Sequence, residues 1–433
     1  MVTVKALHEI FLAHPIISTD TRKIISQSIF FALKGSNFDG NKYIDEAIRR
    51  GASFVVYDNP EYGKEDDKYL LVDDVLTTLQ KLANYHRRSS QAKIIGITGT
   101  NGKTTTKELI FAVLKTTFKT IATEGNLNNH IGVPLSLLTI KPEDEIAIIE
   151  MGANHPKEIG FLCSIAEPNY GIITNVGKAH LEGFGSFEMI QKTKAELYHC
   201  VANRGGKLFI HYEDTLLKNL LPKDVSTISY STEGNSNADT YIKEESDNSI
   251  LIRLKAKFPK GFLYILTNLV GTYNCSNLAA AISIGKYFNV EPLRIKEAIE
   301  GYIPTNLRSQ YTRRQYNDLI VDTYNANPSS MQEAIKNFLK LKHPNKIVIL
   351  GDMLELGDVS EQEHLKLIEL LKEGSLKECI LVGEIFSKIA PNANTFLNTD
   401  ELIQQLQKDE IKEALVLIKG SRGIGLEKIL YLF

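Results

Sequence analysis

The chain has 433 residues, of which 43% are hydrophobic and 24% charged, so it is too long for one typical core and we expect two or three domains. Its formal net charge of −2 gives no general attraction to nucleic acid or to an anionic membrane, so an anionic ligand must bind at a local cluster, and we expect no nucleic-acid partner. Four scattered cysteines, the lack of a signal-peptide pattern and the lack of a long apolar segment predict a cytoplasmic protein without membrane insertion.

The first predicted unit is a small α/β domain over residues 1–90. The run IFFALK, residues 29–34, predicts a strand, and FDGNKYIDEAIRRGASFVVYD predicts a turn, an amphipathic helix, a glycine stop and a strand. The polar stretch HRRSSQAK, residues 86–93, predicts a linker before the next strand. This linker sets the first boundary near residue 90.

The second predicted unit covers residues 91–305. Apolar runs at IIGIT, EIAIIE, YGIITNV and KLFIHY alternate with helical patterns, which predicts a central, mostly parallel sheet flanked by helices. Residues 232–257 are polar with local alternation, so we expect a β excursion there and not another βα repeat.

The third predicted unit covers residues 306–433 and is Rossmann-like. It follows the helical stretch NCSNLAAAISIGKYF and a turn at Pro304, and its strands are predicted at LIVDTY, KIVILGD, CILVGE and ALVLIKG. No short repeat period is present in the sequence. The expected fold class is therefore α/β with three domains.

The segment IIGITGTNGKTTTKELIFAVL predicts a phosphate-binding loop between a buried strand and a helix that begins around Lys103. Backbone N–H groups from Gly99 to Lys103 can surround phosphate oxygens, Lys103 adds a positive charge, and Thr104 offers a hydroxyl to magnesium. Position 97, where the common P-loop has glycine, is Ile97, so this is a shortened variant. Glycines that serve only a tight turn would not explain a lysine and three threonines at the start of the helix.

Two polar residues follow predicted strands at the same sheet edge. Glu150 ends EDEIAIIE before the flexible MGANH, and together with the phosphate loop its carboxylate predicts a magnesium ligand in preference to a solvated loop acid. His180 lies in a loop after the strand YGIITNV. From its chemistry alone, a structural histidine and a functional one are about equally good interpretations.

Lys192 and Lys194, in QKTKAELYHC, are predicted at the beginning of an amphipathic helix. Charged residues in such a helix ordinarily form a solvated face. The residue pattern alone therefore gives neither lysine a catalytic role.

Several motifs together resemble the Mur ligase family: GTNGKTTTKE, EGNLNNHIGVPLSLL, EMGANHPKEI, TNVGKAHLEGFGS, KAELY, DTYNANPSSM, GDMLELG and LIKGSR. They extend over nearly the whole chain in the family's order. Within the family, EMGAN and AHLEGFG resemble the branch that adds a dipeptide and not the branches that add single amino acids.

The resemblance implies an ATP- and magnesium-dependent ligase that joins a carboxylate to an amine through an acyl phosphate. The implied substrates are a UDP-muramoyl tripeptide and D-alanyl-D-alanine, in the synthesis of peptidoglycan precursors, and we expect a monomer. It further implies that Lys103 contacts ATP phosphates and that Thr104, Glu150 and His180 surround magnesium, with two ions expected. Lys194, in preference to Lys192, matches a lysine carried as a carbamate, whose charge helps to hold a second magnesium.

The resemblance also assigns residues to the nucleotide and to the UDP substrate. The cofactor-binding set is Gly99, Thr100, Asn101, Gly102, Lys103, Thr104, Thr105, Asn277 at adenine, Arg308 near the γ-phosphate, Asp322 at the ribose, and Asn325. An Asx turn before Pro328 is an equally good interpretation of Asn325. The segment STDTRKIISQSIFFALKGSNFDGNK resembles the family's uridine-nucleotide domain, with substrate contacts implied at Thr21, Arg22, Lys34 and Asn41, although Ser28 replaces a frequent glycine.

Three alternatives remain open from the sequence. One is another amide ligase of similar construction, of the Mur or folylpolyglutamate type. A second is a P-loop switch or motor, which the shortened loop and Glu150 disfavour. A third is a non-catalytic nucleotide-binding module, although every charged position that the proposed chemistry needs is present.

Overall fold

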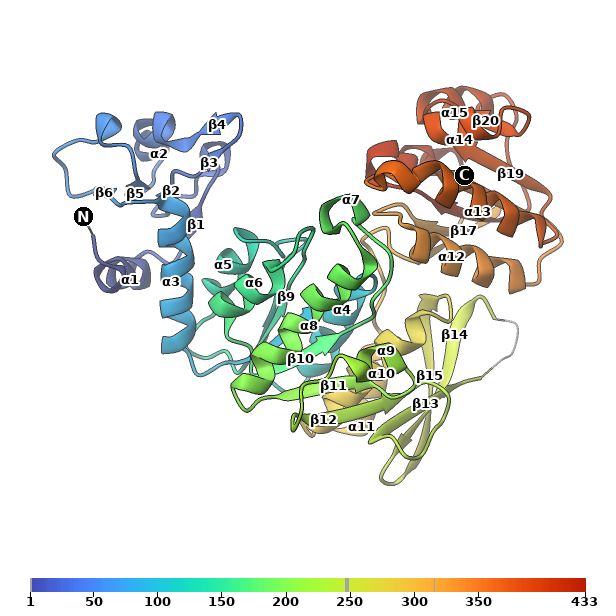
Figure 1. Ribbon diagram of the computed structural model, residues 1–433, viewed down its shortest axis with the longest axis horizontal. Helices are drawn as coiled ribbons and strands as arrows, with labels where there is room; N and C mark the ends of the chain where they lie inside the picture. Colours follow the sequence, from blue (N-terminus) through green and yellow to red (C-terminus); the bar gives the residue numbers. More distant parts are fainter. Residues whose placement is uncertain (1, 246–248, 315) are drawn as a thin grey trace.

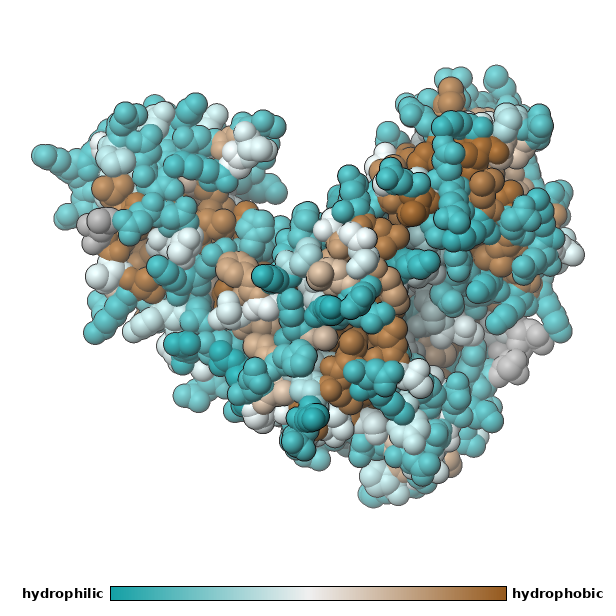
Figure 2. All heavy atoms as spheres, in the orientation of Figure 1, coloured by the Kyte–Doolittle hydropathy of each residue, from teal (hydrophilic) through white to brown (hydrophobic). Residues whose placement is uncertain are grey.

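The computed structural model describes residues 2–245, 249–314 and 316–433. The chain forms three consecutive parts that lie along a curved arrangement, with the N-terminal part and the C-terminal part at opposite ends and the central part between them (Figure 1). The space-filling view shows a deep notch between the two outer parts (Figure 2). The predicted α/β fold class is confirmed by the strands and helices described below.

The N-terminal part has a four-stranded parallel sheet in the order β1-β2-β5-β6. Its strands are β1 Ile17–Ser18, β2 Ile29–Phe31, β5 Phe54–Tyr57 and β6 Tyr69–Leu71, with a small hairpin of β3 Lys34–Gly35 and β4 Phe38–Asp39. Its helices are α1 Val4–Ala13, α2 Ile44–Arg49 and α3 Val75–Ser89. The predicted strand 29–34 is therefore split, because the chain turns into the β3–β4 hairpin after β2.

The predicted linker at residues 86–93 is wrong for its first half. Helix α3 continues to Ser89, and His86 and Arg87 are buried. The Arg87 guanidinium donates to the Ala166 carbonyl oxygen at 3.0 Å and to Asn169 Oδ1 at 3.0 Å. These polar partners in the central part allow a charged helix end to be buried, which a polar composition does not predict.

The central part is built on six parallel strands in the order β12-β11-β10-β7-β9-β8. Their bounds are β7 Lys93–Thr98, β8 Thr120–Ala122, β9 Ile146–Glu150, β10 Tyr170–Ile173, β11 Lys207–His211 and β12 Ser226–Ser231. The helices are α4 Lys103–Leu114, α5 Gly132–Leu137, α6 Glu158–Ala166, α7 Leu181–Phe184, α8 Phe187–Asn203, α9 Thr215–Asn219, α10 Asn274–Tyr287 and α11 Pro292–Glu300. Helices α4 and α10 pack over one apolar face of the sheet, and α6 and α8 pack over the other.

The predicted β excursion is present in the described residues as β13 Thr240–Glu244, β14 Leu251–Phe258 and β15 Gly261–Val270, which pair antiparallel in this order. Residues 246–248 of the predicted segment lie outside the described residues. Strand β15 then pairs with β16 of the C-terminal part through Leu269 and Gln310, so the hydrogen-bonded sheet continues past residue 305.

The C-terminal part orders its strands as β20-β19-β18-β21-β17-β16, parallel except for the antiparallel pair of β16 and β17. Their bounds are β16 Gln310–Arg313, β17 Asn317–Asp322, β18 Lys346–Gly351, β19 Glu378–Val382, β20 Asn394–Phe396 and β21 Ala414–Lys419. The helices are α12 Pro328–Lys340, α13 Ser360–Lys372, α14 Glu384–Ile389 and α15 Thr399–Leu406. Strands β17, β18, β19 and β21 match the four apolar runs that predicted them.

No helix in the described part of the chain is both long enough and apolar enough to span a bilayer. Buried aliphatic side chains on both faces of the parallel strands explain why these strands read as nearly continuous apolar runs.

Candidate functional site

A cleft of about 800 Å³ lies where the carboxyl ends of the central strands face the C-terminal part. Many of the predicted site residues line it: Thr100, Asn101, Gly102, Lys103, Thr105, Glu150, His180, Asn277, Arg308, Asp322 and Asn325. Gly99, Thr104 and Lys194 lie outside the cleft lining. The structure thus brings together groups from both sides of residue 305.

The phosphate loop follows β7 and ends at α4, as predicted. Gly99 has φ +152°, and a Cβ there would lie 1.9 Å from Thr174 Oγ1. Gly102 has φ +79°, and a Cβ there would lie 2.7 Å from Asn277 Oδ1. Glycine is therefore required at both positions by backbone conformation and by space.

The loop is held in place by the neighbouring strand end. Thr174 Oγ1 donates to the Asn101 carbonyl oxygen at 2.6 Å, and Asn101 N–H donates to Asn175 Oδ1 at 2.9 Å. Thr100 Oγ1 accepts from the Gly177 N–H at 2.9 Å. A rigid loop at a helix N-terminus presents its amides to an anion without further ordering.

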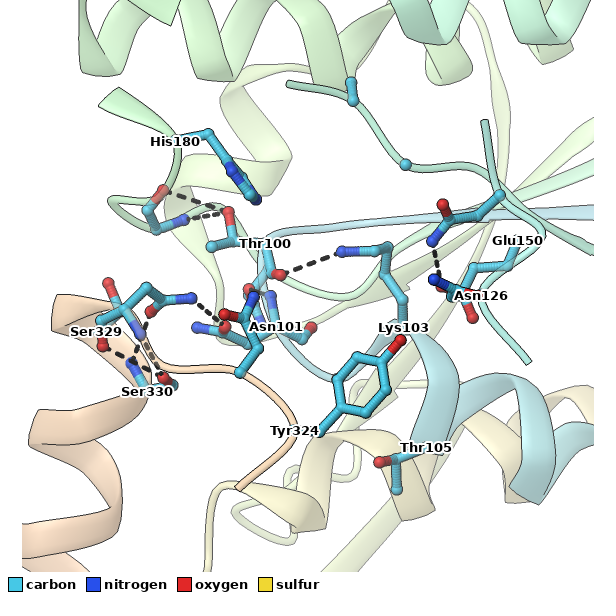
Figure 3. Close-up of a pocket in the computed structure, with 18 of the residues that line it drawn as sticks. Thr100, Asn101, Lys103, Thr105, Asn126, Glu150, His180, Tyr324, Ser329 and Ser330 are labelled. Atoms are coloured by element: carbon cyan, nitrogen blue, oxygen red, sulfur yellow. Dashed lines mark hydrogen bonds between the residues drawn. The ribbon is translucent and has the colours of Figure 1, made fainter. Parts of the chain in front are cut away.

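Lys103 folds back over the loop that it follows (Figure 3). Its Nζ donates to the carbonyl oxygens of Gly99 at 2.8 Å and Thr100 at 3.1 Å. Burial lowers the pKa of Lys103 from its ordinary value; the Glu150 carboxylate opposes this effect and the Arg308 charge adds to it. Lys103, Glu150 and Arg308 are therefore close enough to interact electrostatically.

Among the described residues, buried oxygen atoms near this loop that lack a hydrogen-bond partner include Thr104 Oγ1 and Glu150 Oε2, although the buried Lys107 Nζ lies 3.8 Å from Glu150 Oε2. Glu150 is 1% exposed, and its other oxygen accepts from Asn128 Nδ2 at 2.8 Å. Hard oxygen atoms left without a donor are what a magnesium ion requires. In the described residues, no three His, Cys, Asp or Glu side chains gather as a metal site, so magnesium here would also need nucleotide or water oxygens.

His180 precedes α7 and faces the cleft from above Thr100 (Figure 3). Its Nδ1 lies 2.6 Å from Glu355 Oε2 of the C-terminal part. Burial lowers the pKa of His180, and the nearby Glu355 carboxylate opposes this shift.

The two lysines of α8 differ sharply in environment. Lys192 is exposed and pairs with Glu188 at 2.8 Å, whereas Lys194 is 4% exposed and has no hydrogen bond or ion pair within the described residues. Burial lowers the pKa of Lys194 well below its ordinary value, and the Lys103 charge adds to this effect. The prediction that these lysines begin a helix is wrong, because Ser186 caps the first turn and α8 begins at Phe187.

The C-terminal contributors to the cleft are held by partners from their own domain. The Arg308 guanidinium stacks 3.9 Å from the Tyr324 ring centroid. Asp322 Oδ2 accepts from the buried Lys419 Nζ at 2.6 Å. Asn325 Oδ1 accepts from the Ala326 N–H at 2.9 Å, while Asn327 caps α12.

Asn277 is buried between α4 and α10. Its Oδ1 accepts from Thr106 Oγ1 at 2.9 Å, and its Nδ2 donates to Asn274 Oδ1 at 2.8 Å. One amide hydrogen of Nδ2 remains for another acceptor in the cleft.

The predicted substrate residues of the N-terminal part lie apart from this cleft. Arg22 is exposed and pairs with Asp20 at 2.8 Å, and Thr21 is buried beside it. Lys34 Nζ and Asn41 Nδ2 both contact Asp58 Oδ1, at 2.7 Å and 3.0 Å. Asn41 is fully buried, so its amide organises the chain around Asp58.

Comparison with known families explains the three-part construction. Residues 15–87 match the family model described as "Mur ligase family, catalytic domain", residues 97–285 the Mur ligase middle domain, and residues 307–422 the Mur ligase glutamate ligase domain. The UDP-N-acetylmuramoyl-tripeptide–D-alanyl-D-alanine ligase of Bacillus subtilis is 34% identical over 95% of this chain and 92% of the relative. The chain belongs to the Mur ligase family.

Solved Mur ligase structures agree with the whole fold. MurF from Acinetobacter baumannii superposes with a TM-score of 0.85 at 30% identity, covering 96% of this chain and 92% of the relative. MurF ligase from Thermotoga maritima in complex with ADP superposes with a TM-score of 0.85 at 27% identity, covering 98% and 97%. As a Mur ligase, this chain is an ATP-dependent enzyme that forms an amide bond.

Sequence reasoning missed several residues that shape the Mur ligase cleft. Asn128 holds Glu150, Lys419 pairs with Asp322, Glu355 contacts His180, and the buried Lys107 Nζ lies 3.8 Å from Glu150 Oε2. Each lies inside a motif that carried the family resemblance. Their partners are distant in sequence, so motif membership was the available signal and the contacts themselves were not predictable.

Proposed function

We propose that this Mur ligase joins D-alanyl-D-alanine to UDP-N-acetylmuramoyl tripeptide in peptidoglycan precursor synthesis. The observation that carries the proposal is full-length similarity to ligases named for this reaction, such as those of Bacillus subtilis and Escherichia coli, at 34% and 30% identity. The folylpolyglutamate synthase of Mycobacterium tuberculosis, at 13% identity and a TM-score of 0.63, shares the fold alone.

The nucleotide is assigned to the cleft between the central and C-terminal parts. Residues 99–105 surround the phosphates, with Lys103 as the charged contact and Arg308 approaching the γ-phosphate from the opposite wall. Asp322 is assigned to the ribose, and Asn277 to adenine through its remaining amide hydrogen. Asn325, in the loop after Asp322, is also assigned to the nucleotide. The lining residues and the rigid loop support this assignment.

Magnesium fits Thr104 Oγ1 and Glu150 Oε2, which accept no hydrogen bond from the described residues, with His180 on the facing loop. When bound, magnesium would neutralise charge on the transferring phosphoryl group. We further propose two ions and a carbamate on Lys194. The support is burial of a lysine that lacks any anionic partner in the described chain, which a carbamate would convert into an anion.

The reaction needs activation because a carboxylate is a poor acyl donor. The carboxylate of the tripeptide attacks the γ-phosphorus, the bond from that phosphorus to the β,γ-bridging oxygen breaks, and ADP leaves. Lys103 and Arg308 offset the negative charge that gathers on the phosphoryl oxygens. The amine of D-alanyl-D-alanine then attacks the acyl carbon, a proton leaves the nitrogen, and phosphate departs with its bridging oxygen.

The remaining assignments complete the proposal. Residues 1–90 bind the uridine nucleotide, with Thr21, Arg22 and Lys34 as contacts and Asn41 supporting Lys34 through Asp58. Residues 91–305 form the ATP-binding domain and residues 306–433 the third domain. We propose a cytoplasmic monomer that binds small-molecule substrates.

The test is phosphate release from the purified protein with magnesium and ATP. UDP-muramoyl tripeptides that differ in the third residue are each combined with D-alanyl-D-alanine or with single amino acids, and the product mass identifies the amide. We expect phosphate only with both acceptor and dipeptide. ATP consumption that needs neither would indicate a nucleotide switch, and product with a single amino acid would indicate another ligase of the family.

A further inference from the structure

One contact joins the two walls of the cleft at His180, a predicted magnesium-site residue. His180 follows β10 of the central part, and Glu355 follows β18 of the C-terminal part. The distance from His180 Nδ1 to Glu355 Oε2 is 2.6 Å. Both residues therefore lie beyond carboxyl ends of parallel strands, and the two strand edges face each other across the cleft.

Both backbones are in an unusual conformation at this contact. His180 has φ +50° and Glu355 has φ +63°, and neither is glycine. A non-glycine residue held in the left-handed region costs about 1–3 kcal/mol and persists where its surroundings over-determine it. Two such residues in contact are consistent with a pairing that the surrounding structure maintains.

The loop that carries Glu355 is firmly attached to its own domain. Met353 and Leu356 are buried, the Met353 N–H donates to His364 Nε2 at 2.9 Å, and the Leu354 N–H donates to Ser421 Oγ at 3.0 Å. The Glu355 side chain is nevertheless 65% exposed, and its partner among the described residues is His180. The rigid loop thus projects a single carboxylate toward the central domain.

The contact determines which ring nitrogen of His180 faces the cleft. A carboxylate accepts hydrogen bonds, so His180 Nδ1 carries the hydrogen and Nε2 keeps its lone pair. Figure 3 shows the ring directed toward Thr100 and Lys103. A histidine near a metal commonly donates its other ring N–H to a carboxylate, which fixes the ring orientation.

Neighbouring contacts close the same boundary. Asn327 Nδ2 donates to Asn101 Oδ1 of the phosphate loop at 2.8 Å, and the Lys178 N–H donates to Ser329 Oγ at 3.2 Å. A Cβ on Gly177 would lie 2.8 Å from Ser329 Oγ, so the two surfaces are closely packed here.

We propose that Glu355 is a positioning residue, supplied by the C-terminal domain, that orients His180 so that the magnesium–nucleotide site is completed only when the two domains meet. The inference rests on the proposed function and deepens it. Under this proposal, the two domains must meet before His180, a residue of the central domain, is correctly oriented.

The experiment compares Glu355→Ala, Glu355→Gln and a matched control, Glu361→Ala. Glu361 is an exposed glutamate of the same domain that pairs with Lys388 outside the cleft lining. Ligase rate and thermal stability are measured for each variant. Affinity for the non-hydrolysable analogue AMP-PNP is measured by calorimetry with magnesium and again with excess EDTA.

Glu355→Ala is expected to lower kcat by about 10–100-fold and to weaken AMP-PNP binding by about 10-fold with magnesium. Binding in EDTA and the melting temperature are expected to match the parent. Glu355→Gln keeps an acceptor for Nδ1–H and is expected to recover most of the rate, within about 3-fold, and Glu361→Ala is expected to be unchanged. The control separates a specific role from a general loss of surface charge.

The decisive comparison repeats Glu355→Ala in a His180→Ala background. If Glu355 acts through His180, the second substitution adds less than about a 2-fold loss, because coupled residues are non-additive. Full additivity, or a Glu355→Ala variant with parental kcat and magnesium-dependent affinity, would overturn the proposal. Absence of ligase product from the parent would instead overturn the proposed function, while the calorimetric comparison would still test the role of Glu355.

Discussion

At the scale of single residues, the cleft and its surroundings contain several lysines that are buried from water. Lys419 is 1% exposed and has Asp322 as its counter-ion, whereas Lys194 is 4% exposed and has none in the described residues. Lys103 donates only to neutral carbonyl groups. A buried cation without an anion is costly, and we therefore propose that ligands or a modification supply the negative charge near Lys103 and Lys194.

Lys103→Ala should remove phosphoryl transfer, with a loss of at least about 10²–10³-fold, because the variant lacks the cation at the transferring phosphate. Phosphate release is the measurement, and circular dichroism checks that the fold is intact. A folded variant with full activity would contradict the role assigned to Lys103.

Lys194→Ala should be inactive and should regain part of its activity when short carboxylic acids are added, because a free carboxylate can take the place of the carbamate. Lys192→Ala is the matched control, since Lys192 lies two residues away on the same helix and pairs with Glu188 at the surface. It should keep the parental rate. If Lys194→Ala is as active as the parent without added acid, the carbamate is absent.

At the scale of elements, the site is made by strand ends and by the helices that cross behind them. Strand β7 ends at the phosphate loop, β9 ends at Glu150, and β10 ends before His180. In the C-terminal part, β17 ends at Asp322, β18 ends before Glu355, and β21 ends at Lys419. Such apolar runs were predictable from sequence because both faces of a parallel strand are buried. Glu150 and the phosphate loop were predictable for the same reason, since polar residues directly after such runs must lie at one sheet edge.

Other features could not be predicted because their causes are distant in sequence. The end of α3 is helical because Arg87 finds acceptors at Ala166 and Asn169, about eighty residues away. The pairs His180–Glu355 and Asn101–Asn327 depend on how two domains meet, which no local pattern records. The preference for Lys194 over Lys192 came from family resemblance, and the burial that distinguishes them appears only in three dimensions.

Helices α1 and α3 meet through two buried histidines, and this contact should depend on pH. His86 Nε2 donates to the Ile140 carbonyl oxygen at 2.7 Å, so His86 Nδ1 accepts from His8 Nε2 at 3.1 Å. Burial lowers the pKa of both below 6.5. Between the lowered pKa values and 6.5 the unfolded chain binds more protons than the folded one, so the free energy of unfolding falls as the pH decreases through this range.

Urea unfolding at pH 7.5 and pH 5.5 measures this effect in the parent and in His86→Gln, whose amide can still donate to Ile140. The parent should lose more stability on acidification than the variant does. Other buried histidines contribute to both proteins alike, so equal losses would show that this pair does not titrate on unfolding.

At the scale of the whole molecule, the nucleotide cleft is shared between two domains and should couple them. AMP-PNP with magnesium at 100 times its Kd should raise the free energy of unfolding by about 2.7 kcal/mol. EDTA should remove most of this gain if the Thr104 and Glu150 oxygens act through magnesium. Urea titrations of the same sample with and without EDTA provide the measurement, and an identical gain in both would exclude a metal-dependent site.

In the part of the chain that the structure describes, one residue pair, Leu269 with Gln310, joins β15 to β16, whereas β14 with β15 and β17 with β21 pair along several residues. A junction of one residue pair contains few hydrogen bonds. Rotation of one part of the sheet relative to the other therefore breaks few of them. We expect the C-terminal domain to rotate about this point as a rigid body. It would open to admit the three substrates and close without disturbing the core on either side of the junction.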